Sequence, residues 1–69
     1  MLFTTSGGLV IYLGTIQAVT EVTRSVDEFY FHIYMHGSLV LEINNEKEEA
    51  VVTDREALLK AWRSFLKGE

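Results

Sequence analysis

The residues best suited to chemistry in this 69-residue chain are two histidines, His32 and His36. Imidazole is a common metal ligand and titrates close to neutral pH. The flanking sequence FYFHIYMH alternates as a strand does, and on a strand the two rings lie about 13 Å apart. One zinc ion cannot bridge that distance within a single copy of the chain. We therefore expect no metal site and no cofactor.

Acid, base and nucleophile types also occur as Asp27, Asp54 and Ser38, but no catalytic motif links them to a histidine. The Ser6-Gly7-Gly8 turn is not followed by the Lys-Ser/Thr pair of a phosphate-binding loop. A chain this short also leaves little room for a pocket of about 300 Å³ or more. These observations predict a protein that is not an enzyme.

Three tyrosines, Tyr12, Tyr30 and Tyr34, could stack on the bases of a single-stranded nucleic acid if one sheet face presented them together. Such sites place basic side chains beside the rings. Residues 1–53 carry two basic residues against seven acidic ones, a balance of −5, and the whole chain has a net charge of −4. This charge disfavours phosphate backbones. Nucleic-acid binding is therefore kept only as an alternative hypothesis.

A second alternative rests on an acidic candidate surface formed by Glu42, Glu46, Glu48 and Glu49, which could bind a basic protein partner. The simpler interpretation is that these carboxylates keep a sheet edge solvated and unpaired.

The elements that must position these residues are organised around residues 29–43, FYFHIYMHGSLVLEI. Period-two alternation of aromatic and β-branched residues predicts a strand on each side of a turn at His36-Gly37-Ser38. A two-residue loop would place Tyr34 opposite Leu39. A three-residue loop would place Met35 opposite Leu39, so that the apolar sets share one face, and we prefer this register.

Further strands are expected on both sides of this hairpin. Residues 1–5 form a short strand, and residues 9–23 form either one long strand bent at Gly14, which we prefer, or two strands. The continuous apolar run 9–13 suggests burial on both faces. After an Asn44-Asn45 turn, whose loop length of two or four residues stays open, residues 46–52 return as an edge strand.

One helix is predicted from Thr53, because Thr53-Asp54-Arg55-Glu56 fits the capping-box pattern. Its apolar residues fall on one stripe, with Trp62 and Phe65 as the large anchors. The stripe consists of Leu58, Leu59, Ala61, Trp62, Phe65 and Leu66. Gly68 ends the helix.

Together these elements predict a single α+β domain over residues 1–69. It is an antiparallel β-meander of four to five strands with one C-terminal amphipathic α-helix packed on one face. A helix of about 14 residues is about 21 Å long and covers one face of such a sheet. The other face would carry Tyr30, His32, Tyr34 and Val40, which are rich in aromatic and aliphatic atoms.

A chain of this size buries a small core, and with no cysteine it has no disulfide to reinforce it. We therefore expect a homodimer that covers the Tyr30, His32, Tyr34 and Val40 face, with closure of the sheet on itself as the alternative. The predicted function is that of a small protein-protein interaction module, either an adaptor or an inhibitor. The sequence shows neither a membrane-spanning segment nor a signal peptide, so the expected location is the cytoplasm.

Overall fold

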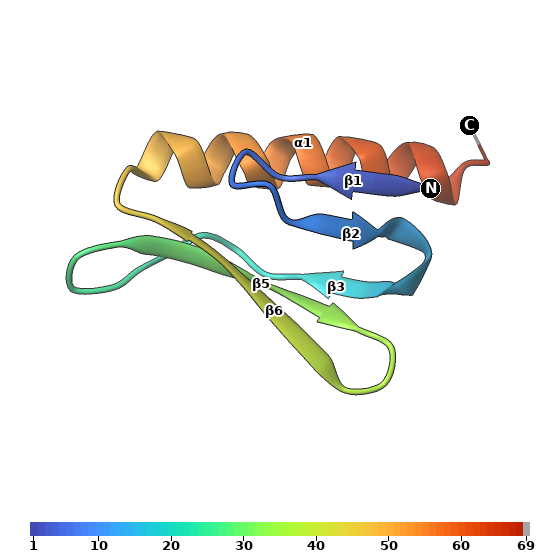
Figure 1. The fold of residues 1–69 in the computed structure, drawn as a ribbon, viewed down its shortest axis with the longest axis horizontal. Coiled ribbons are helices and arrows are strands. Elements are labelled where there is room, and N and C mark those ends of the chain that lie inside the picture. The colour runs from blue at the N-terminus through green and yellow to red at the C-terminus, as the bar shows by residue number, and fades with distance from the viewer. Residues whose placement is uncertain (69) are drawn as a thin grey trace.

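The computed structural model describes residues 1–68 and confirms the α+β class, with six strands in two antiparallel sheets and one C-terminal helix (Figure 1). The elements are β1 (Leu2–Thr4), β2 (Val10–Tyr12), a 3-10 turn (Leu13–Thr15), β3 (Ile16–Val19), β4 (Thr23–Arg24), β5 (Phe29–Met35), β6 (Leu39–Asn45) and α1 (Glu48–Leu66). No helix in this part of the chain has both the length and the apolar character needed to cross a membrane.

Strand β5 is the centre of the four-stranded sheet. Along one side it pairs with β6 over its full length, and along the other it pairs with β3 and then with β4. Met35 faces Leu39 and Ile33 faces Leu41, which confirms the three-residue loop. Gly37 and Ser38 in this loop have φ of 86° and 64°, a left-handed conformation that glycine adopts without steric cost and that a tight hairpin loop needs.

The prediction of one bent strand over residues 9–23 is wrong, because the 3-10 turn separates two strands that belong to different sheets. Strand β2 pairs with β1, whereas β3 pairs with β5. Gly14 lies in that turn, where a Cβ would come within 3.0 Å of the Tyr12 ring and 3.4 Å of the Phe65 ring. The glycine therefore marks a close approach of aromatic side chains, one of them from the helix.

The expected burial of residues 9–13 on both faces is also wrong. Ile11 and Leu13 are buried, but Val10 and Tyr12 are 54% and 52% exposed. The β1–β2 hairpin is two strands wide, so only its inward face reaches the core. The apolar outer residues stay in contact with solvent.

The helix begins at Glu48, five residues before the predicted start, so neither the edge strand over residues 46–52 nor the capping box at Thr53 exists. Val51 and Leu58 are seven residues apart and both are 1% exposed, so burial of this stripe against the sheet favours the longer helix. Glu48 and Glu49 in the first turn interact favourably with the helix dipole. Lys47, the N-cap residue, makes no side-chain cap.

The core lies between α1, the β1–β2 hairpin and one face of the four-stranded sheet. Its buried residues are Ile11, Leu13, Ile16, Phe31, Ile33, Met35, Ile43, Val51 and Leu58. Trp62 and Phe65, the expected anchors, are only half-buried and pack at the periphery of this cluster. The turn between β5 and β6 projects away from α1 (Figure 1), which leaves Leu39 53% exposed although it lies opposite buried Met35.

Candidate interaction surface

The face of the four-stranded sheet opposite the core is not covered by the helix. We call it the open sheet face. Across the strands it forms rows given by the pairing register, with Ala18, Tyr34 and Val40 in one row, His32 and Glu42 in the next, and Thr23, Tyr30 and Asn44 in the third.

All four residues predicted for the interface lie on the open sheet face. Tyr34 and Val40 are cross-strand neighbours and are 43% and 47% exposed. Tyr30 and His32 are half-buried, and their rings lie 5.1 Å apart at an angle of 50°. Because the apolar row at Tyr34 and Val40 stays exposed, the sheet of the single chain does not close over this face.

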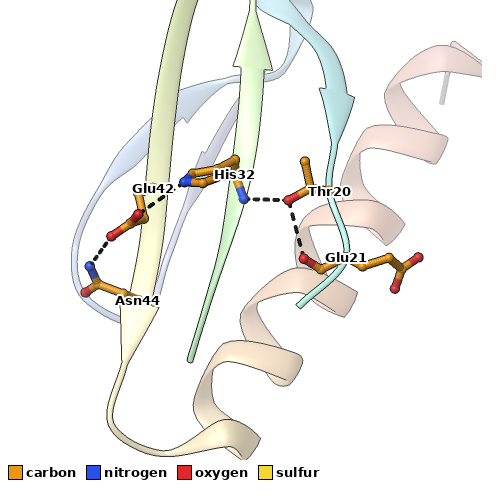
Figure 2. A network of polar contacts seen from close by, with 5 residues as sticks. All are labelled: Thr20, Glu21, His32, Glu42 and Asn44. Atoms are coloured by element: carbon orange, nitrogen blue, oxygen red, sulfur yellow. Dashed lines mark hydrogen bonds and ion pairs between the residues drawn. The ribbon is translucent and has the colours of Figure 1, made fainter. Parts of the chain in front are cut away.

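A polar network crosses the middle of the open sheet face (Figure 2). The His32 Nε2 atom lies 3.1 Å from Glu42 Oε1, and the Asn44 side-chain amide donates a 2.8 Å hydrogen bond to Glu42 Oε2. Both contacts are local consequences of the register, because Glu42 faces His32 across the strands and Asn44 follows two residues later on the same face. Both oxygens of the Glu42 carboxylate therefore have a hydrogen-bond partner on this face.

These contacts determine the protonation of Glu42. The hydrogen bond from Asn44, followed by the contacts with His32, lowers the pKa of the Glu42 carboxyl below its ordinary value. Hydrogen bonds to a carboxylate stabilise its charged form. Glu42 therefore stays ionised to a lower pH than an ordinary glutamate, and at neutral pH its carboxylate can accept a hydrogen bond or a cation.

Thr20 connects this network to the interrupted edge formed by β3 and β4. Its backbone N–H donates to the His32 carbonyl at 2.9 Å, and its hydroxyl oxygen accepts the His32 backbone N–H at 2.8 Å. The hydroxyl in turn lies 3.4 Å from the Glu21 carbonyl (Figure 2). Thr20 thus supplies a side-chain partner to β5 at the point where the ladder of β3 stops.

The helix fixes the same segment from the other side. Arg55 Nε donates a 2.7 Å hydrogen bond to the Thr20 carbonyl, and its guanidinium lies 3.4 Å from a carboxylate oxygen of Glu21. The Arg55 side chain is 19% exposed, so its donor is largely shielded from water. Arg55 therefore holds the irregular link between β3 and β4 against α1.

A hollow of about 170 Å³ lies where the end of β6, the β1–β2 turn and α1 meet. Asp54 spans the turn and the helix, since its two carboxylate oxygens accept hydrogen bonds from the Ser6 N–H at 3.1 Å and the Ser6 hydroxyl at 2.7 Å. The hollow is lined by Thr5, Ser6, Gly7, Leu9, Glu42, Ile43, Asn44, Asn45 and Asp54. No basic residue is among them.

The acidic candidates are divided between two places. Glu42 belongs to the network on the open sheet face, whereas Glu46, Glu48 and Glu49 follow β6 at the junction with α1. All four are exposed. In this arrangement two of the carboxylates lie in the first turn of the helix, where they stabilise it rather than protect a sheet edge.

The structure separates the remaining candidates. Tyr12 lies on β2 in the smaller sheet, apart from the sheet that holds Tyr30 and Tyr34, so the three tyrosines share no stacking platform. His36 lies in the β5–β6 turn, with its Nδ1 atom 3.3 Å from the Gln17 amide. Among residues 1–68, no three His, Cys, Asp or Glu side chains gather in a group that could hold a metal ion.

The sequence analysis did not predict the hydrogen bonds described above that involve Thr20, Asn44, Asp54 and Arg55. Asn44 could have been found from the period-two pattern of β6, had it not been assigned to a turn. The other three meet partners 12 to 48 residues away in the chain, and no local pattern encodes such contacts.

Comparison with protein families, characterised proteins and solved structures finds no match to this chain.

Proposed function

We propose that this protein is a small, non-enzymatic interaction module that acts as a homodimer, with the open sheet face as its interface. The observation that carries the proposal is the exposed apolar row at Tyr34 and Val40, 43% and 47% exposed, near the β5–β6 turn of the four-stranded sheet. Tyrosine is enriched at protein interfaces because it combines a large apolar ring with a polar end. We propose the cytoplasm as the location, with which the absence of cysteine is compatible.

A second copy is the favoured occupant because of where the charge lies. The chain has a net charge of −4, which opposes self-association in general. On the open sheet face, however, Glu42 is bonded to His32 and Asn44. A two-fold arrangement brings the same patch of both copies together, and a face whose single carboxylate is already hydrogen-bonded offers little charge repulsion to its copy.

The size of the face sets the expected affinity. It is three strands wide and seven residues long, which is about 14 Å by about 23 Å. Stable interfaces bury about 800 Å² on each partner, and this face provides less. We therefore expect a weak dimer whose population depends on concentration, in the micromolar range of dissociation constants.

The test is the solution mass by light scattering, measured from about 1 µM to about 500 µM. We expect the mass to rise from that of one chain, 7.9 kDa, toward twice that value. Tyr34→Lys should hold the protein at the single-chain mass. Tyr12→Lys is the matched control, because Tyr12 is a tyrosine of similar exposure on the other sheet, 52% against 43%, and its replacement adds the same charge.

Circular dichroism establishes that both variants are folded. A wild-type mass of one chain at every concentration overturns the proposed dimer. A Tyr12→Lys variant that dissociates as fully as Tyr34→Lys would place the interface elsewhere.

A further inference from the structure

Strand β6 has an open edge. Its backbone pairs with β5 on one side, and among residues 1–68 no backbone hydrogen bond joins Leu39–Asn45 to any other strand. The edge is seven residues long, against three in each strand of the smaller sheet. Unpaired N–H and C=O groups in a row form a template for another strand.

This edge lacks the features that usually prevent strand addition. The sequence LVLEINN contains no proline and no lysine, and its one charged residue, Glu42, is held by His32 and Asn44. The register with β5 continues without a bulge from Leu39 to Asn45. Edges are normally protected by one of these features or by a covering element. By contrast, the opposite edge of the sheet is broken into two short strands with a register shift after Ile16.

The two ends of the β6 edge differ in chemistry. At the turn end, Leu39 and Val40 are 53% and 47% exposed on opposite faces of the sheet. At the other end lies the hollow of about 170 Å³, whose only ionisable lining residues are Glu42 and Asp54. Both are carboxylates, so this end of the edge is acidic at neutral pH.

We propose that the β6 edge binds an extended segment of a partner protein as an added strand. The segment carries apolar side chains that contact Leu39 and Val40, and a lysine or arginine that lies at the acidic hollow. Main-chain hydrogen bonds supply the affinity in this mode of recognition, and alternate side chains supply the specificity. A dimer formed through the open sheet face covers Val40 but leaves the backbone edge of β6 free, so the added strand keeps its main-chain hydrogen bonds and its contact with Leu39 in either state.

The probe is a capped synthetic peptide of alternating valine and threonine with a lysine at each end. Binding is followed by NMR on the isotope-labelled protein, through the amide shifts and hydrogen exchange of residues 39–45. Two further peptides carry N-methyl groups on alternate amides, one on the odd and one on the even positions. An added strand directs alternate N–H groups to its neighbour, so we expect one methylated peptide to lose at least about tenfold in affinity and the other to bind normally.

Charge is tested separately. Replacing both peptide lysines with glutamates should weaken binding several-fold. Asp54→Asn should reduce this preference for lysine, whereas Asp27→Asn, an exposed carboxylate in the loop before β5, should leave it unchanged.

Three results contradict the inference. Equal weakening by both methylated peptides would mean that no strand is added. Peptide-induced shifts confined to the open sheet face would move the site away from β6. If the amide chemical shifts of residues 39–45 change with protein concentration but not on addition of peptide, the β6 edge pairs with a second copy of the chain instead.

Discussion

A proline at Thr53 distinguishes the observed helix from the shorter helix that the sequence suggests. Thr53 is the sixth residue of α1 and is exposed, so its side chain contributes little to packing. Its N–H group donates to the carbonyl four residues earlier. Proline removes that hydrogen bond and its ring collides with the same carbonyl, which costs about 3 kcal/mol in a helix interior.

That cost is large for this chain. A core of this size supplies about 3–5 kcal/mol of net stability, so Thr53→Pro should retain about 0–2 kcal/mol. With a urea dependence of about 1 kcal/mol per molar for a small domain, the unfolding midpoint should fall by about 3 M. Urea unfolding followed by far-UV circular dichroism and by the fluorescence of Trp62 measures this shift.

Glu48→Pro is the matched control. Glu48 is the first helical residue, where proline is tolerated because its N–H needs no helical partner. The preceding Lys47 has φ of −100° and ψ of 122°, the extended conformation that a residue before proline prefers. The loss of one carboxylate from the first turn costs about 0.3–1 kcal/mol, a midpoint shift of about 1 M or less.

Thr53→Ala isolates the loss of the side chain and should change the free energy of unfolding by about 0.5 kcal/mol or less. A Thr53→Pro midpoint within the range of Glu48→Pro would refute a helix that begins at Glu48. It would favour a helix with Thr53 as its N-cap, because a proline there would precede the first helical turn.

Two further predictions concern the polar contacts. The hydrogen bond from Asn44, and then the contacts with His32, lower the pKa of Glu42. The ionised carboxylate therefore stabilises the fold at pH values above the ordinary carboxyl pKa of about 4.3. This contribution is lost as the pH falls through the lowered pKa. Glu42→Gln should therefore be less stable than the wild type in urea at neutral pH, and the difference should shrink as the pH is lowered below the ordinary carboxyl value; a difference that does not change with pH contradicts this. Arg55→Met keeps the apolar stem but removes the donor to the Thr20 carbonyl, and should lower the free energy of unfolding by about 1–2 kcal/mol and speed hydrogen exchange around Thr20.

Lys60→Met is the control for Arg55→Met, because Lys60 is an exposed cation on the same helix. It should leave both the free energy of unfolding and the exchange near Thr20 unchanged. Equal effects of the two substitutions would mean that charge loss alone, and not the contact with Thr20, explains the result.

The β5–β6 hairpin was predictable because its signals agree. Strict alternation over seven residues fixes which side chains share the core face, and only the three-residue loop aligns that set with the apolar residues of β6. Gly37 meets the conformational demand of the turn. The four interface candidates follow from the same alternation, so their placement on one face needed no long-range information.

The helix start was not predictable to the same degree, because EKEEAVV fits an edge strand and a first helical turn equally well. What decides is tertiary burial, since only a helix brings Val51 into the core together with Leu58. The division of residues 9–23 into two strands has a similar cause. Gly14 was a visible signal, but its meaning depends on Phe65, which lies at the far end of the chain.

The unprotected edge of β6 also bears on the solubility of the protein. Each copy presents one open backbone edge, the outer side of the seven-residue strand β6, and at neutral pH the net charge of −4 keeps copies apart. Near the isoelectric point, about 5.0, that repulsion vanishes while the edge remains. Strands can then stack without the limit that a closed dimer imposes, as they do in cross-β fibrils. The protein is therefore best concentrated at a pH well above 5 and at low salt, where like charges are least screened.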